Sequence, residues 1–162
     1  MGSVETADPL RAAFEEHYAL LLRLSILLSG GREAAEDIVQ EAFVRVAHRI
    51  EDVPAERLRA YLRQVVVNLW RNQLRRLVRE RGARARSLFD GQTDAPDPAD
   101  STALRAAVMK LPAQQRACVV LRYYEDLPER EVAALLNCSI GTVKSHTSRA
   151  LARLKKEFDD EA

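Results

Sequence analysis

Glycine, proline and aromatic side chains are scarce in this chain of 162 residues, which holds six glycines, six prolines and 6% aromatic residues. Ala, Leu, Arg and Glu dominate instead, and because these residues favour helix, the composition predicts an all-α fold. Long apolar runs are also missing, since no stretch reaches the ~18 residues of a membrane span. The first ten residues lack the apolar segment of a secretory signal. We therefore expect no membrane insertion and a cytoplasmic protein.

Residues that carry catalysis or bind metals are few as well. The two cysteines, Cys118 and Cys138, are isolated in the sequence and are expected to be reduced and buried rather than bridged. His17, His48 and His146 are scattered, and neither an HExxH motif nor a glycine-rich phosphate loop is present. The two cysteines and His146 match no common zinc spacing. The sequence therefore predicts no enzyme, no cofactor and no metal.

Charge is strongly segregated, although the net charge is only +1. Residues 57–86 carry ten arginines and one glutamate, a net charge of +9. Residues 1–56 carry a net charge of −6, and residues 87–103 carry four aspartates and no basic residue. A local arginine block of this kind favours contact with nucleic acid, and a solvated arginine-rich helix is the alternative.

Apolar spacing predicts three helices in the first half of the chain, over residues 9–29, 33–49 and 55–81. The first is expected to end at Gly30. One face of it is predicted to hold Phe14, Tyr18, Leu21, Leu22, Ser25 and Leu28. These helices form a predicted N-terminal domain over residues 9–81.

Residues 82–101 lack periodicity and contain prolines and aspartates, so they are predicted to form a flexible linker between two small helical domains. The C-terminal domain, residues 102–158, is predicted to contain helices near 101–110 and 113–124, one that begins at Pro128, and a last one from Ser139 to Phe158.

Residues 129–150 have the pattern of a helix-turn-helix, with Ala133 or Ala134 at the helix contact, a break at Asn137 and Cys138, and Val143 as apolar anchor. The predicted inward face of the second helix consists of Val143, Thr147, Ala150, Leu151 and Leu154. The outward face carries side chains that can bond to base edges or phosphates, namely Thr142, Lys144, Ser145, His146, Ser148 and Arg149. An ordinary pair of helices with a polar outer face is the alternative.

Three segments together resemble the sigma-70 family of bacterial sigma factors. AEDIVQEAFVRV is similar to the family's polymerase-binding helix. AYLRQVVVNLWRNQLRR is similar to the promoter-melting helix of the extracytoplasmic-function (ECF) group within the family. Within that group, the sequence resembles members of the actinobacterial branch. LPAQQRACVVLRYYEDLPEREVAALLNCSIGTVKSHTSRALARLKK resembles the C-terminal domain of that group. The resemblance covers residues 11–156 and implies an alternative, signal-responsive sigma factor that binds core RNA polymerase and directs transcription initiation.

The resemblance implies that residues 33–49 bind the clamp coiled coil of the largest polymerase subunit. The matching positions are Asp37, Gln40, Glu41 and Phe43. Acidic and amide groups suit a basic coiled coil, with Phe43 either as an apolar anchor or as a core residue.

The arginine-rich helix is implied to contact the −10 promoter element, where unpaired bases need aromatic, amide and cationic partners. The matching positions are Tyr61, Asn68, Arg71, Asn72, Arg75 and Arg76. The family usually has Trp at position 61 and Asp at position 72, so this sequence departs from the pattern at two points. Trp70 belongs to the same segment, and packing against the first helix is the alternative for it.

The helix-turn-helix is implied to contact the −35 element with its outward face and with Arg122, and the domain to contact the polymerase flap. Whether Arg149 contacts a base or a phosphate stays open. The two elements lie about 16–17 base pairs apart, roughly 55 Å of B-DNA at ~3.4 Å per pair, and a linker of about 20 residues spans ~65 Å.

The resemblance also implies an anti-sigma factor as partner. Three other classes of protein are the alternatives: a free-standing dimeric regulator, a protein-only adaptor and a nuclease. The regulator leaves the polymerase-binding motif and the arginine helix unexplained, and the nuclease lacks clustered carboxylates.

Overall fold

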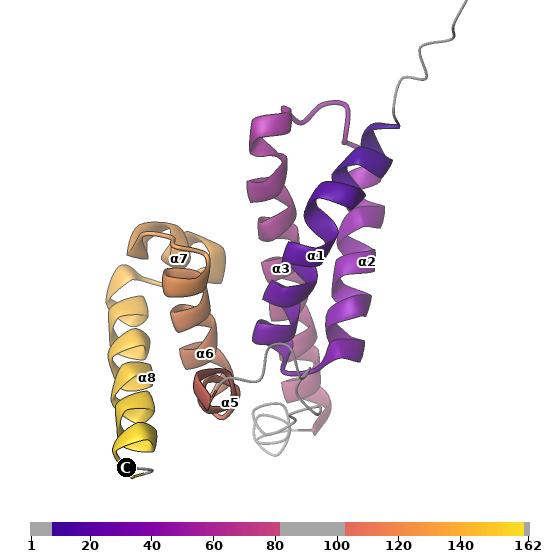
Figure 1. Ribbon diagram of the computed structural model, residues 1–162. Coiled ribbons are helices and arrows are strands. Elements are labelled where there is room, and N and C mark those ends of the chain that lie inside the picture. Colours follow the sequence, from indigo (N-terminus) through magenta and orange to yellow (C-terminus); the bar gives the residue numbers. More distant parts are fainter. Residues whose placement is uncertain (1–7, 82–102, 161–162) are drawn as a thin grey trace, which may run out of the picture.

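The N-terminal domain is a bundle of three helices (Figure 1). The computed structural model describes residues 8–81 and 103–160, and these residues form helices and the turns between them. The bundle consists of α1 (Pro9–Ser29), α2 (Arg32–Ala47) and α3 (Ala55–Arg81), each packed against the other two. The three predicted helices are confirmed, with boundaries within two residues of those expected.

The C-terminal domain holds α5 (Ala103–Met109), α6 (Ala113–Val119), η1 (Val120–Tyr124), α7 (Glu129–Leu136) and α8 (Ile140–Asp160). The segment η1 is a π-helix that extends α6, and its wider turn is closed by the bond from the Glu125 amide to the Val120 carbonyl, 3.0 Å. The sequence predicted an ordinary helix there, because apolar periodicity does not distinguish a π-turn from an α-turn. None of the described helices is long and apolar enough to cross a membrane.

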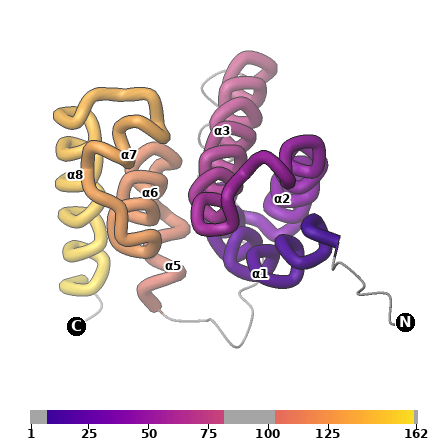
Figure 2. The backbone as a smooth tube through the Cα atoms, turned by 90° about the horizontal axis from the view of Figure 1, so that it is seen from above, coloured from indigo at the N-terminus to yellow at the C-terminus, as the bar shows by residue number. Residues whose placement is uncertain are grey.

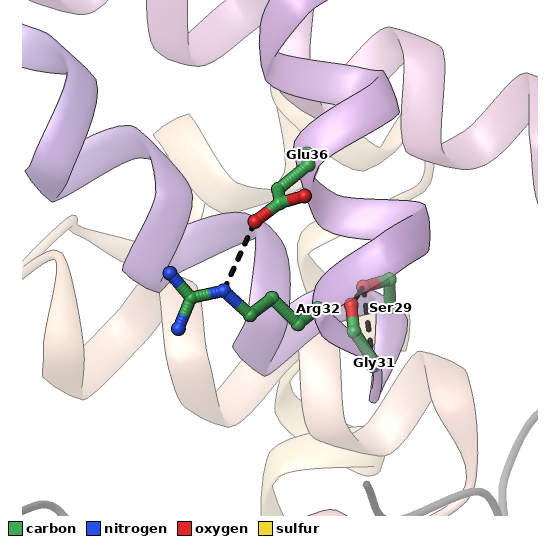
Figure 3. A network of polar contacts seen from close by, with 4 residues as sticks. All are labelled: Ser29, Gly31, Arg32 and Glu36. Carbon is green, nitrogen blue, oxygen red and sulfur yellow. Dashed lines mark hydrogen bonds and ion pairs between the residues drawn. The ribbon is translucent and has the colours of Figure 1, made fainter. Parts of the chain in front are cut away.

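The corner between α1 and α2 is tightly bonded (Figure 3). Gly30 has φ of 83°, a left-handed conformation that glycine adopts without steric cost, and its amide donates to the Ile26 carbonyl. The Ser29 hydroxyl shares its one proton between the Ser25 carbonyl, 2.7 Å away, and the Gly31 carbonyl, 3.0 Å away. These bonds fix the direction in which α2 leaves the end of α1.

The N-terminal core lies between the three helices and includes Leu24, Leu28, Val66 and Trp70, whose side chains are fully buried. Trp70 is therefore a core residue, the alternative that the sequence left open. Phe14 corrects one expectation, because it is 45% exposed instead of facing the core. It stacks on Tyr18 with ring centroids 4.5 Å apart, so its exposed ring borders the surface of the bundle.

The inward face of α8 is confirmed at Val143, Ala150 and Leu154, which are buried, whereas Leu151 is 43% exposed and the expectation for it was wrong. Leu151 follows Ala150 directly, and one residue further along a helix turns the side chain by about 100° out of the contact with α6.

The two domains pack against each other. Figure 2 shows α6 beside α1, and α3 between α2 and the C-terminal helices. The domains contact each other in two regions, where α1 packs against α6 and where α3 packs against α7. The buried apolar side chains form one continuous cluster across both domains. This contact was not expected from the sequence, which indicated two domains joined by a linker; residues 82–101 lie outside the described residues.

Trp70 offers a test of the N-terminal core. Trp70→Ala should lower the free energy of unfolding by about 3–5 kcal/mol, the usual cost of removing a buried aromatic side chain. Val44→Ala, at a position 59% exposed on α2, is the matched control and should change it by less than about 0.5 kcal/mol. Urea denaturation followed by circular dichroism measures both, and equal losses in the two variants would contradict the core placement.

Candidate nucleic-acid and protein interfaces

The outer face of α3 carries the residues predicted to contact the −10 element. Asn68, Asn72, Arg75 and Arg76 are exposed, and their spacing places them along one side of the helix. Tyr61 lies further toward the start of α3 and is partly buried against the core. The helix thus presents amide and guanidinium groups in a row, which is suited to single-stranded nucleic acid.

Arg71 differs from its neighbours on the outer face of α3 because it is half-buried. Burial and the nearby charge of Arg75 lower the pKa of Arg71. Burial likewise raises the pKa of the Cys138 thiol, and the positive charge of Arg71 acts in the opposite direction. The two side chains influence each other across the region where α3 packs against α7.

The helix-turn-helix is formed by α7 and α8, as predicted. Asn137 ends α7 in the left-handed conformation with φ of 52°, which asparagine tolerates better than most residues. The Ser139 hydroxyl accepts a hydrogen bond from the Thr142 amide at 3.0 Å and so caps α8. Val143 is fully buried and anchors α8 against α7.

We call α8 the recognition helix, because its N-terminal half carries the predicted −35 contacts. All of these except His146 are exposed: Thr142, Lys144, Ser145, Ser148 and Arg149. The Thr142 hydroxyl is already bonded to Ser139 Oγ at 2.9 Å, and Lys144 Nζ lies 4.0 Å from Glu129 Oε2. Ser145, Ser148 and Arg149 are therefore the most accessible groups for a base edge or a phosphate.

A cavity of about 720 Å³ lies between α3 and the C-terminal domain. We call it the interdomain cavity. Its walls include Asn72, Arg75 and Arg79 of α3, Gln114 of α6 and His146 of the recognition helix. Residues predicted to contact the −10 and −35 elements thus line the same cavity from opposite sides.

The outer face of α2 presents Asp37, Gln40 and Glu41 to solvent, while Phe43 is only 6% exposed. Glu41 pairs with Arg45 at 3.0 Å along the helix, so its carboxylate is partly neutralised. Phe43 packs against Phe14, with ring centroids 5.2 Å apart. Phe14 is the exposed aromatic side chain at this surface, and its position could not be recognised from the sequence because it follows the same apolar periodicity as the core.

Arg122 is half-buried, and its guanidinium donates to the Leu127 carbonyl at 3.2 Å and lies over the Tyr123 ring at 5.5 Å. These contacts stabilise the turn before α7. The assignment of Arg122 to a DNA phosphate stays a prediction.

Two helical modules, one with an arginine and amide row and one with a helix-turn-helix, define a two-domain DNA-binding protein. The family model of sigma-70 region 2 matches residues 13–80 of the sequence, and the family model of sigma-70 region 4 matches residues 101–154. The chain therefore belongs to the sigma-70 family.

Similar proteins are ECF-type sigma factors. The RNA polymerase sigma-E factor of Streptomyces antibioticus is 38% identical over 77% of this chain and 71% of the relative. The ECF sigma factor SigL of Mycobacterium tuberculosis is 30% identical over 90% of this chain and 86% of the relative. Among solved structures, the sigma factor RpoE of Bartonella quintana in complex with the anti-sigma factor NepR aligns with a TM-score of 0.71 at 25% identity, over 94% of this chain and 98% of that one.

His146 gives a prediction about pH. Burial, and secondarily the positive charge of Arg149, lower the pKa of His146 below its ordinary value of 6.5; Arg75 and Arg79 face it across the interdomain cavity. The unfolded chain then binds the proton more tightly than the folded chain, so His146 costs no stability above pH ~6.5 and destabilises the fold progressively as the pH falls below it.

The Tm of the protein should therefore fall more steeply between pH 7.5 and 5 than that of His146→Gln, measured by thermal denaturation in matched buffers. His48→Gln, at an exposed position, is the control and should keep the wild-type slope. Parallel slopes for the protein and for His146→Gln would contradict the assignment.

Proposed function

We propose that this protein is an alternative, signal-responsive sigma factor of the ECF type, a non-enzymatic initiation factor that acts in the cytoplasm. The observation that carries the proposal is the separation of three chemically distinct surfaces in one chain. An acidic row lies on α2, an arginine and amide row on α3, and a recognition helix in the other domain. A free-standing regulator with a helix-turn-helix needs only the last of these.

The acidic row on α2 is proposed to bind the clamp coiled coil of core RNA polymerase. Asp37, Gln40 and Glu41 are exposed on one face, which suits a basic partner. Phe43 is proposed to act indirectly, because its ring packs against Phe14 and supports the exposed Phe14 ring.

The promoter contacts are proposed to be divided between the domains. Tyr61, Asn68, Arg71, Asn72, Arg75 and Arg76 of α3 are assigned to the −10 element. Arg122, Thr142, Lys144, Ser145, His146, Ser148 and Arg149 are assigned to the −35 element. Apolar side chains left exposed on α5 and α8, Leu104 and Phe158, are proposed to contact the polymerase flap, since they lie away from the recognition surface.

An anti-sigma factor is proposed as a further partner. The support is the similarity to RpoE, which was crystallised with the anti-sigma factor NepR and aligns with both domains of this chain.

Run-off transcription with core polymerase on a genomic fragment library tests the proposed function. The wild-type chain should direct specific transcripts, and Asp37→Ala/Gln40→Ala should lose at least about tenfold in apparent affinity for core, the effect of ~1.4 kcal/mol. Glu33→Ala, which removes one exposed acidic charge from the first turn of α2 and leaves the Glu41–Arg45 pair intact, is the control. The proposal fails if no transcript depends on the protein, or if the double variant and Glu33→Ala bind core equally in a pull-down.

Arg149 tests the recognition helix. If it contacts a guanine, Arg149→Ala should cost ~1–3 kcal/mol only at promoters with that base; if it contacts a phosphate, all −35 sequences should weaken together. Transcription from a library of −35 variants separates the two outcomes, with Arg153→Ala, exposed one turn further along α8, as control. A change in −10 preference instead would contradict the division of contacts between the domains.

A further inference from the structure

The interdomain cavity is lined by positive charge without a compensating acid. Arg75 and Arg79 of α3 line it, and none of its lining residues within the described part of the chain is an aspartate or a glutamate. Both arginines are exposed, and neither has a hydrogen-bond or ion-pair partner among the described residues. Their guanidinium groups are therefore available to a ligand that enters the cavity.

The spacing of these two arginines favours an anion between them. They are four residues apart on α3, so they lie one turn apart on the same face, and like charges at this spacing repel each other. Burial, and secondarily the charge of Arg75, lower the pKa of Arg71, which lies one turn earlier in the same row. A phosphate group would relieve this repulsion, because guanidinium groups bind phosphate oxygens with two parallel hydrogen bonds.

The remaining walls of the cavity suit an organic group. Leu74 and Val78 of α3 and Pro112 of the C-terminal domain contribute apolar surface. Asn72 and Gln114 contribute amides, which can donate and accept hydrogen bonds at the edge of a base or at a sugar hydroxyl. The volume of about 720 Å³ lies within the ~300–1,000 Å³ that is usual for small-molecule sites.

His146 adds an aromatic ring to the C-terminal wall. Because burial and, secondarily, the charge of Arg149 lower the pKa of His146 below 6.5, its imidazole is neutral at pH 7. A neutral imidazole adds no repulsion to that between Arg75 and Arg79. Imidazole rings also stack on nucleobases, so this wall suits the base of a nucleotide.

Polar contacts outside the cavity hold its two walls together. The buried Arg116 of α6 donates to the Leu28 carbonyl of α1 at 2.9 Å. Arg63 of α3 donates at 3.2 Å to the carboxylate of Glu125, which follows η1 and whose side chain is only 5% exposed. The cavity is therefore formed before a ligand enters, which lowers the entropic cost of binding.

We propose that the interdomain cavity binds a nucleoside di- or triphosphate, with its phosphates between Arg75 and Arg79 and its base against His146. The base also covers the apolar surface of Leu74 and Val78, and the amides of the two walls bond to the sugar or to the base edge. The ligand thus contacts both domains. The site stands independently of the proposed function, because it requires neither polymerase nor promoter DNA.

Isothermal titration calorimetry of the full-length chain with ATP and with GTP, in about 150 mM salt and without divalent metal, tests the site. At least one of the two nucleotides should bind, and Arg75→Gln/Arg79→Gln should weaken that binding at least about tenfold. Arg57→Gln/Arg153→Gln is the matched control, because both arginines are exposed, do not line the cavity and carry the same charge. Absence of binding to the wild-type chain, or equal losses in the two double variants with circular dichroism showing both folded, overturns the site.

Inorganic tripolyphosphate separates a nucleotide site from a general polyanion patch. It should bind the wild-type chain at least about fivefold more weakly than the nucleotide, since it lacks the base. His146→Ala should weaken nucleotide binding by about fivefold, the effect of ~1 kcal/mol, and leave tripolyphosphate binding unchanged. Equal affinities of the wild-type chain for tripolyphosphate and nucleotide overturn the assignment to a nucleotide.

Nuclear magnetic resonance of the ¹⁵N-labelled chain locates the ligand. The side-chain amide signals of Asn72 and Gln114, from the two walls, should both shift when the nucleotide is added. A shift of Asn72 alone shows that the ligand binds the surface of α3 and overturns the cavity as the site.

Discussion

A single buried guanidinium determines how the ends of several helices meet in this protein. Arg116 bonds to a carbonyl from the last turn of α1, to one from the last turn of α5 and to one from the turn before α6. Those carbonyls would otherwise lie unsatisfied in a dry interface, at a cost comparable with that of a lost hydrogen bond. The buried charge of Arg116 also needs these carbonyls as partners, and they come from both domains. The bundle and the helix-turn-helix domain are therefore held in one relative position. The continuous apolar cluster across both domains follows from that position.

The helices could be predicted well because local signals agree with each other. Glycine at the end of α1, a serine cap before α8 and apolar spacing along α3 all point to the structure observed. Predictions of core membership failed at Phe14 and Leu151, where the periodicity places a side chain near the edge of a buried face. Whether such a residue is covered depends on how far the neighbouring helix extends, and this information is not local in sequence.

The sequence predicted which residues form the candidate surfaces better than it predicted how these surfaces lie relative to one another. Exposure of the acidic row on α2 and of most of the recognition helix follows from the same periodicity that defines the core. The half-burial of His146 does not, because His146 lines a cavity whose other wall is formed by α3, a helix far away in the chain. Arg116 is the only charged residue of α6, but the sequence alone does not show that it is buried, because a solvent-facing arginine produces the same pattern.

The π-helix η1 makes the length of one segment unusually critical. Successive residues of an α-helix are rotated by about 100°, and the wide turn of η1 accommodates one residue more than an α-turn does. Deletion of a single residue from η1 would leave a regular helix and shift the carboxylate of Glu125 around the axis, away from α3. The turn at residues 48–54 contains no π-turn, although Ile50 and Val53 pack against the core. Natural length variation should therefore be rarer in η1 than in that turn, except in chains whose acidic residue has shifted by one position along the helix.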